Sequence, residues 1–135
     1  MRAIDLLGGT EILSEEACLE LLQSQGIGRL AMVVDDRIDI FPVNYVMDGR
    51  SILFGTNEGH KILGFSAGEV AFEVDSIEEE AHAGWSVVLH GTPELVTDRV
   101  EPGEDAVHPW TGHKEFLVRI RPRSITGRQV VPGAP

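Results

Sequence analysis

The stretch from Arg37 to Lys61 constrains the fold of this chain more than any other segment. Its first half is rich in β-branched and aromatic residues, which suit a half-buried strand. Asp48 and Gly49 follow, a pair that supplies the positive φ angles of a two-residue hairpin turn. Residues 52–54 then form an apolar return strand. The stretch therefore predicts a β-hairpin.

Polar side chains of several kinds gather directly after this return strand. Thr56, Asn57, His60 and Lys61 bring a hydroxyl, an amide, an imidazole and an ammonium group close together in the sequence. Such groups just beyond a strand end are suited to holding a small anion. We interpret the hairpin as the support of a ligand site.

Length and charge narrow the class of protein. The 135 residues suit a single domain, 1–135, with a full core. A net charge of −11 argues against nonspecific binding to nucleic acid or to an anionic membrane, because both need a basic surface. The single cysteine, Cys18, cannot form an internal disulfide, and no signal peptide or membrane span is recognisable. We expect a cytoplasmic protein.

The charges are unevenly distributed along the chain. Acidic residues crowd the segment 69–80, whereas the last quarter is basic through Lys114, Arg119, Arg121, Arg123 and Arg128. One interpretation is solvated surface with pairing across strands or subunits. The alternative is that the basic residues help to bind an anionic cofactor.

The rest of the chain predicts a mainly β fold with one good helix. Ser14 is a suitable N-cap, and the helix should run to about Gln25 with Gly26 as its stop. Cys18, Leu21 and Leu22 share one face of this helix, which makes the cysteine a core residue. A second, short helix is expected within 58–66.

Strands are expected at 27–34, 70–74 and 116–121, with a short edge segment at 125–131. The segment 85–96 predicts either a strand pair or one long bent strand, and 77–83 and 97–112 predict loops. Pro42 within its strand indicates either a sheet edge or a bulge, and Pro122 should end the strand before it. Together these elements predict a small antiparallel barrel with helices at its ends.

Several familiar chemistries have no support in the sequence. There is no glycine-rich phosphate loop and no GxSxG nucleophile turn. The five histidines do not fall at helical metal-ligand spacing, and one cysteine cannot anchor a zinc cluster. We predict no metal site and name no catalytic residue.

The order of several short motifs, however, resembles a known family. These are GIGRLA (26–31), FPVNY (41–45), ILFGTNEGHK (52–61), AFEVD (71–75), GWSVVLHG (84–91), and VRIRP with ITGR near the end. Their succession over roughly residues 12–130 is similar to the pyridoxamine 5′-phosphate oxidase-like, FMN-binding split-barrel family. The resemblance implies a six-stranded antiparallel split β-barrel and a homodimer whose two cofactor sites lie at the subunit interface.

The resemblance also implies a cofactor and the residues that contact it. FMN, or alternatively a deazaflavin cofactor, would place its ring against the backbone of Pro42, Val43 and Asn44. Trp85 and Ser86 would lie beside the ring. The phosphate would be held by Thr56 and Lys61, with His60 as a further candidate.

The chain also departs from the family pattern. Many relatives have arginine at the position of Gly55, and a basic residue commonly stands at that of His90. The resemblance implies a flavin-dependent oxidoreductase or reductase that acts on a small planar substrate. The alternative is a non-catalytic protein that stores, carries or senses a flavin-like or haem-like ligand. A true pyridoxamine phosphate oxidase is less expected, because the chain is short for that enzyme.

Overall fold

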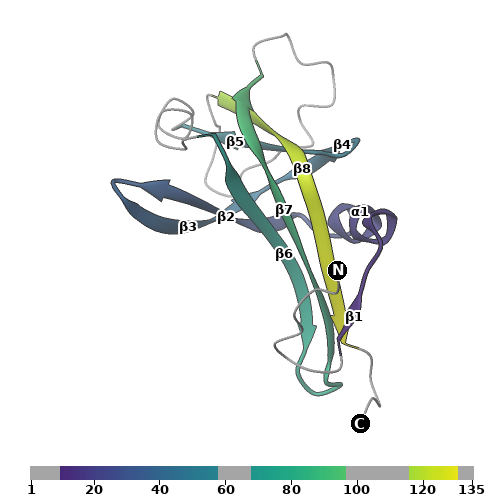
Figure 1. Cartoon of the computed structure of the whole chain (residues 1–135). Coiled ribbons are helices and arrows are strands. Elements are labelled where there is room, and N and C mark those ends of the chain that lie inside the picture. The colour runs from purple at the N-terminus through teal and green to yellow at the C-terminus, as the bar shows by residue number, and fades with distance from the viewer. Residues whose placement is uncertain (1–9, 58–67, 97–115, 131–135) are drawn as a thin grey trace.

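A computed structural model describes residues 10–57, 68–96 and 116–130 of the chain. These residues form eight strands and one helix (Figure 1). In chain order the elements are β1 Glu11–Ile12, α1 Glu15–Gln23, β2 Ile27–Val34, β3 Arg37–Asn44, β4 Val46–Asp48, β5 Ser51–Thr56, β6 Val70–Glu78, β7 Ala83–Leu95 and β8 Phe116–Val130.

All strand pairs of the described residues belong to one antiparallel sheet, in the order β3-β2-β6-β7-β8-β5-β4, with β1 added beside β8. The sheet curls into a half-barrel in which β6, β7 and β8 form a long ladder and the β2–β3 hairpin projects to one side (Figure 1). The predicted mainly β, split-barrel fold is thus confirmed.

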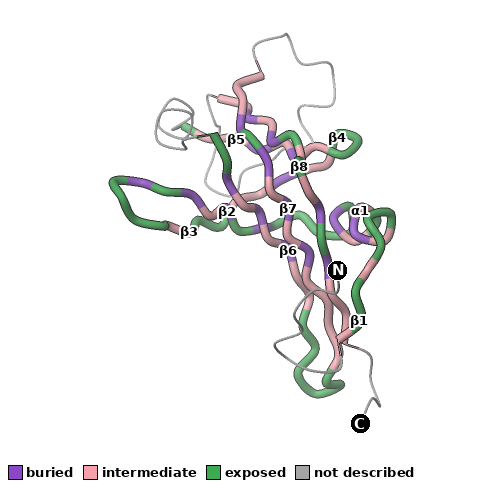
Figure 2. Tube along the Cα trace, in the orientation of Figure 1, coloured by how far each residue is buried: buried purple, intermediate pink, exposed green. Residues whose placement is uncertain are grey.

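The core lies on the concave face of this sheet. Alternate residues of the long strands point inward, so Phe72, Val74 and Leu89 are fully buried while their chain neighbours are not (Figure 2). Cys18 and Leu22 of α1 are also fully buried in this cluster. Burial raises the pKa of the Cys18 thiol, which agrees with its predicted place in the core.

Helix α1 begins as predicted but ends earlier. The Ser14 side chain accepts a hydrogen bond from the Ala17 N–H at 3.1 Å, as an N-cap should. The helix ends at Gln23 instead of Gln25, because Ser24 forms the C-cap and donates its N–H to the Leu21 carbonyl oxygen. The next carbonyl group along the helix, that of the buried Leu22, accepts a 2.6 Å hydrogen bond from the buried Tyr45 hydroxyl. Burial raises the pKa of Tyr45 well above its ordinary value.

The predicted hairpin over 37–61 is confirmed for residues 46–53 and wrong for residues 37–44, which pair with another strand. The first run is divided at Tyr45, whose N–H donates to the Gly26 carbonyl oxygen, into β3 and the shorter β4. Strand β3 pairs with β2 across the Asp35–Asp36 turn, and β4 alone pairs with β5. The second turn is also shifted by one residue. Asp48 pairs with Ser51, so Gly49, with φ +62°, takes the first central position.

Three prolines lie within strands, and the two that carried an expectation from the sequence, Pro42 and Pro122, are accommodated by different means. The β2–β3 register is continuous from Ile27 to Val34, so Pro42 lies in a plain edge strand and the alternative of a bulge is excluded there. Pro122 does not end its strand. It lies opposite Gly91 where the β7–β8 register shifts, and this irregularity lets β8 continue as one strand of 15 residues.

Four further predictions remain, two of them on described residues. Residues 85–95 belong to one long strand, β7, which was one of the two alternatives. The predicted loop 77–83 is shorter, because β6 extends to Glu78 and β7 begins at Ala83. The predicted short helix within 58–66 and the loop 97–112 lie outside the described residues. Among the residues that the structure describes, no helix is long and apolar enough to cross a membrane.

Candidate flavin site

The predicted ring contacts lie at the end of the edge strand β3. Pro42 pairs with Arg29, Val43 with Gly28 and Asn44 with Ile27. Pro42 is exposed, whereas Val43 and Asn44 are partly buried and Val43 packs against the core. Among the described strands β3 has a neighbour on only one side, so its other backbone edge is an edge of the sheet as described.

Of the three predicted phosphate contacts, Thr56 lies within the described residues. Thr56 is the last residue of β5, where it pairs with Phe116, and it is partly buried. Gly55, which replaces the arginine of many relatives, precedes it and pairs with Leu117. His60 and Lys61 lie outside the described residues.

Trp85 and Ser86 lie near the far end of the long ladder. Trp85 pairs with Gln129 and Ser86 with Arg128, whereas Thr56 pairs with the first residue of the same strand. With a rise of about 3.3 Å per residue, the two groups are separated by roughly 40 Å along β8. One chain therefore does not bring Thr56 and Trp85 together. A single site that uses both must combine two copies of the chain.

A pocket of about 460 Å³ lies at the far end of the ladder, beside the β6–β7 turn. Its walls are mostly apolar, and Trp85 contributes an indole ring that also packs against the core. The turn is tight, since His82 adopts φ +52°. The lining residues are Thr10, Ile77, Glu78, Glu79, His82, Ala83, Gly84, Trp85, Ser86, Arg128 and Val130.

Arg128 is the cation in this pocket that the predicted set of cofactor contacts omitted. It comes from the ITGR motif, and its guanidinium Nη1 lies 3.3 Å from the Thr10 hydroxyl oxygen. The signal was present in the sequence as the basic last quarter. Composition alone could not show which of its arginines faces a pocket, because that depends on the register of β8 against β7.

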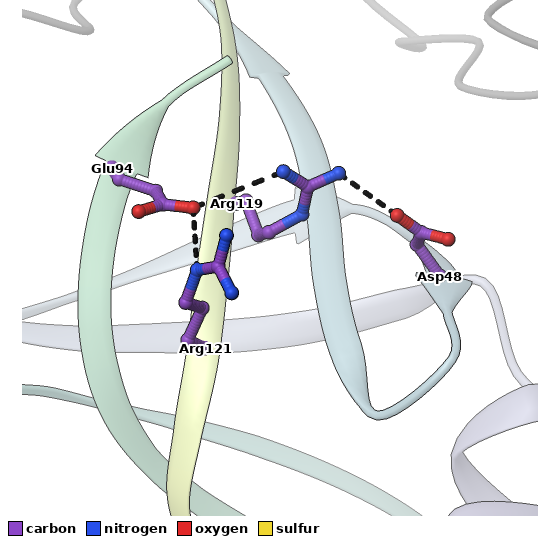
Figure 3. Close-up of polar contacts among 4 residues, drawn as sticks. All are labelled: Asp48, Glu94, Arg119 and Arg121. Atoms are coloured by element: carbon purple, nitrogen blue, oxygen red, sulfur yellow. Dashed lines mark hydrogen bonds and ion pairs between the residues drawn. The ribbon is translucent and has the colours of Figure 1, made fainter.

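The other arginines of β8 are engaged with carboxylates. Arg119 donates to Asp48 at 2.8 Å and lies 3.8 Å from Glu94, which also accepts a 2.7 Å hydrogen bond from Arg121 (Figure 3). Arg123 forms two hydrogen bonds with Glu69, of 2.6 and 2.8 Å, which lower the pKa of that carboxyl group. For these three arginines the structure supports pairing across strands, and not a cofactor site.

A second cluster of charge lies on the outer face of the sheet. Arg29 Nη1 of β2 contacts Glu73 Oε1 at 3.1 Å and Asp75 Oδ2 at 3.3 Å. Burial, and then the neighbouring Asp75 carboxyl group, raise the pKa of Glu73 to about 7, although Arg29 opposes the shift. Two carboxyl groups thus share one guanidinium.

The chemistry of the pocket fits one part of a flavin. An indole and aliphatic side chains suit a planar ring, and the Ser86 hydroxyl and the Arg128 guanidinium are donors for its oxygen and nitrogen atoms or for a phosphate. Within residues 10–57, 68–96 and 116–130, no group of three or more potential metal-ligating side chains comes together. Fold and pocket together define a split-barrel domain with a pocket whose lining suits a planar, polar ligand.

Comparison with known proteins specifies the family. The profile of the family described as pyridoxamine 5′-phosphate oxidase matches residues 14–129, and the chain belongs to this family. A protein of *Mycobacterium tuberculosis*, described as uncharacterized protein Rv0080, is 31% identical over 129 residues, which cover 88% of this chain and 84% of that one.

Solved structures agree with this assignment. An FAD binding protein from *Mycobacterium smegmatis* is 34% identical, with a TM-score of 0.69 over 89% of this chain and 97% of the other. A conserved protein of unknown function from *Corynebacterium diphtheriae* is 36% identical, with a TM-score of 0.70 over 91% and 99% of the two chains.

Proposed function

We propose that this chain is a homodimeric, FMN-dependent oxidoreductase or reductase that acts on a small planar substrate, with a deazaflavin as the alternative cofactor. The observation that carries the proposal is the pocket of about 460 Å³ beside Trp85, because Trp85 and Ser86, which the family pattern puts beside the ring, line it together with Arg128. The *M. smegmatis* relative, which is described as binding FAD, supports a flavin ligand.

In this proposal the site is shared between two subunits. One copy contributes the edge of β3 and Thr56, with His60 and Lys61, and the other contributes Trp85, Ser86 and Arg128. The separation of these groups along β8 supports this arrangement, since no single chain joins them. The same arrangement would give two equivalent sites per dimer.

The flavin, when bound, would supply the hydride or electron transfer itself. The residues of the chain would bind and orient it. The Pro42–Asn44 backbone would contact the ring, the Trp85 side chain would cover apolar surface and exclude water, and the Thr56 hydroxyl would donate to the phosphate. Arg128 would supply a cation that the Gly55 position lacks. No side chain need act as a general base for this chemistry.

Titration of FMN and of a deazaflavin with the purified protein tests the proposal. We expect quenching of ligand fluorescence at micromolar protein. Arg128→Gln should weaken binding by about 10- to 100-fold, the effect of losing one charge-assisted hydrogen bond of about 1.5–3 kcal/mol. Arg121→Gln is the matched control and should bind normally, because Arg121 pairs with Glu94. Absence of quenching with either ligand would contradict the proposal.

A second function, non-catalytic storage or sensing of a flavin-like or haem-like ligand, is favoured by one feature. Gly55 stands where many relatives carry a phosphate-binding arginine, so the phosphate loses a bidentate partner. Assay of the flavin-loaded protein with reduced nicotinamide separates the two functions. Turnover of the nicotinamide would exclude the second function.

A further inference from the structure

The β2–β3 hairpin presents a face of exposed apolar side chains. Of the seven large apolar side chains that are exposed among the described residues, five belong to β2 and β3. Val33 pairs with Ile38, and Ala31 with Ile40, so these four share one side of the hairpin. Ile38 is 74% exposed and Ile40 64%. Figures 1 and 2 show the hairpin standing away from the body of the sheet.

This apolar face continues without a break onto a cluster of charge. Arg29 pairs with Pro42 on one side and with Glu73 on the other, and Glu73 pairs with Val88 of β7. Ala31, which pairs with Ile40 on one side, pairs with Ala71 of β6 on the other. Arg29, Glu73 and Asp75 therefore lie on the same outer face as Ile40, with side chains 51%, 32% and 27% exposed.

We propose that a second copy of the chain packs on this outer face of β2, β3 and β6, and that assembly is accompanied by uptake of a proton by the Glu73–Asp75 carboxyl pair of each subunit. The inference rests on the homodimer of the proposed function and specifies both its surface and its dependence on pH. The occupant is a second copy because the proposed site is incomplete without one, and because its contact at Pro42 lies on this same surface.

Charge explains why a proton should be taken up. Two carboxylates that share one guanidinium carry one excess negative charge, and covering them removes the water that remains around them. Each chain already has a net charge of −11, so two copies repel. One proton for each carboxyl pair neutralises the cluster. It then becomes compatible with a buried interface.

Among the residues that the structure describes, Arg29 is the cation that forms ion pairs with Glu73 and Asp75. Strand β2 brings Arg29, β6 brings Asp75, and the residues opposite on β7 are Val88 and Ser86, which do not titrate. On the same face His90 lies opposite Ala71, and Arg128 lies one strand further, opposite Ser86. The pKa of Glu73 is already raised to about 7 in the single chain, by burial first and then by Asp75.

The direction of the pH dependence follows from linkage. If the pKa rises further on assembly, the dimer binds more protons than two monomers, so dimerisation strengthens as pH falls from about 8 toward 6. Two protons per dimer allow at most about a hundredfold change in the dimer Kd per pH unit. We expect at least about a tenfold tighter Kd at pH 6.5 than at pH 8.

Sedimentation velocity over a concentration series at pH 6.5, 7.2 and 8 measures this dependence. Glu73→Gln mimics the protonated group, so it should dimerise at all three pH values with the slope reduced. Ile40→Glu should leave a folded monomer by circular dichroism and thermal unfolding. Phe41→Glu is the matched control, because Phe41 is 40% exposed on the same strand but pairs with the buried Leu30, on the other side of the hairpin.

Each outcome bears on a different part of the inference. A dimer that Ile40→Glu disrupts but whose Kd does not change with pH would overturn the proton uptake alone. A dimer that survives Ile40→Glu and is lost in Phe41→Glu would overturn the choice of face. A monomer at every pH and concentration would overturn the shared site of the proposed function as well. If such a monomer quenched flavin fluorescence, the proposal that the chain binds a flavin would still hold.

Discussion

At the scale of single residues, the phosphate end of the proposed site depends on one absent side chain. Gly55 pairs with Leu117 directly before Thr56, at the end of β5 where the phosphate is expected. A guanidinium there would add a planar, bidentate donor that Lys61 does not replace, because an ammonium group acts as a point charge. The position therefore sets the affinity for a phosphorylated cofactor.

Gly55→Arg should accordingly strengthen FMN binding. One added charge-assisted hydrogen bond of about 1.5–3 kcal/mol corresponds to roughly a 10- to 100-fold lower Kd. Fluorescence titration of FMN measures it, with Gly55→Gln as the control for adding a side chain without charge. Equal affinities in the arginine and glutamine variants would show that no phosphate is held beside β5.

Tyr45 is a second residue at which a single polar group should affect the stability of the fold. Its buried hydroxyl donates to the Leu22 carbonyl oxygen at the end of α1, a group without a helical partner. Tyr45→Phe should lower the free energy of unfolding by about 1–3 kcal/mol, the cost of an unsatisfied buried acceptor. Urea denaturation checks this value.

Ser24→Ala provides the comparison, since the Ser24 hydroxyl donates to the neighbouring Leu21 carbonyl oxygen at an exposed position. Water can replace that donor, so the loss should stay within about 0.5 kcal/mol. If both variants lost equal stability, the burial of the Tyr45 hydroxyl would not be the cause.

At the scale of elements, close packing of α1 on β8 depends on Gly127. A Cβ atom built at this position would lie 2.6 Å from Cys18 Sγ and 3.2 Å from Leu13 Cδ1. Leu13 is further held there by a 2.9 Å hydrogen bond from its N–H to the Gly127 carbonyl oxygen. The helix can therefore approach the strand only where no side chain intervenes.

Gly127→Ala should destabilise the fold by about 1–3 kcal/mol, the usual cost of overpacking. Gly26→Ala is the matched control, because a Cβ atom there meets nothing within 4 Å. It should be neutral, or stabilise by up to about 1 kcal/mol through the unfolded chain. Thermal unfolding measures the melting temperatures of both variants. Equal melting temperatures would contradict the conclusion that Gly127 is needed for close packing.

Elements were predictable from the sequence where the pattern was local. The Ser14 cap and the strand 27–34 followed from residue chemistry and alternation. The partner of β3 was not predictable in this way, because 37–44 is flanked by two turns and either could have formed its hairpin. The exposure of Ile38 and Ile40 was also missed. Alternation predicts a half-buried strand, whereas this hairpin extends beyond the core.

At the scale of the whole molecule, the long ladder separates the two halves of the proposed site. The family pattern assigned Thr56 and Trp85 to one cofactor, and their positions near opposite ends of β8 became known only from the strand register. Sequence motifs identify which residues contact a ligand, but they do not contain the distance between those residues. The sharing of a site between subunits is a property of the assembled fold.

A mixture of two defective variants tests this sharing. Thr56→Ala and Trp85→Ala should each weaken FMN binding tenfold or more. A mixed two-fold dimer of the two variants has one site with both defects and one intact site, so random mixing should restore about a quarter of the sites. Titration before and after subunit exchange measures the recovery. No recovery, in a mixture shown by native mass spectrometry to contain mixed dimers, would place the whole site in one chain.

The proline in the edge strand has a consequence for how copies of this chain meet. Among the described strands β3 is the last of the sheet on one side, and its ladder to β2 is unbroken at Pro42. Because proline has no N–H to donate to β2, we infer that its nitrogen faces the outer edge of β3. A further strand that added there would find a gap in the row of donors. The proline thus opposes the addition of strands from other chains at this edge. The apolar face of the same hairpin is the proposed contact with a second copy. In the proposed assembly the hairpin would therefore contact a second copy through its face, and not by adding strands at its edge.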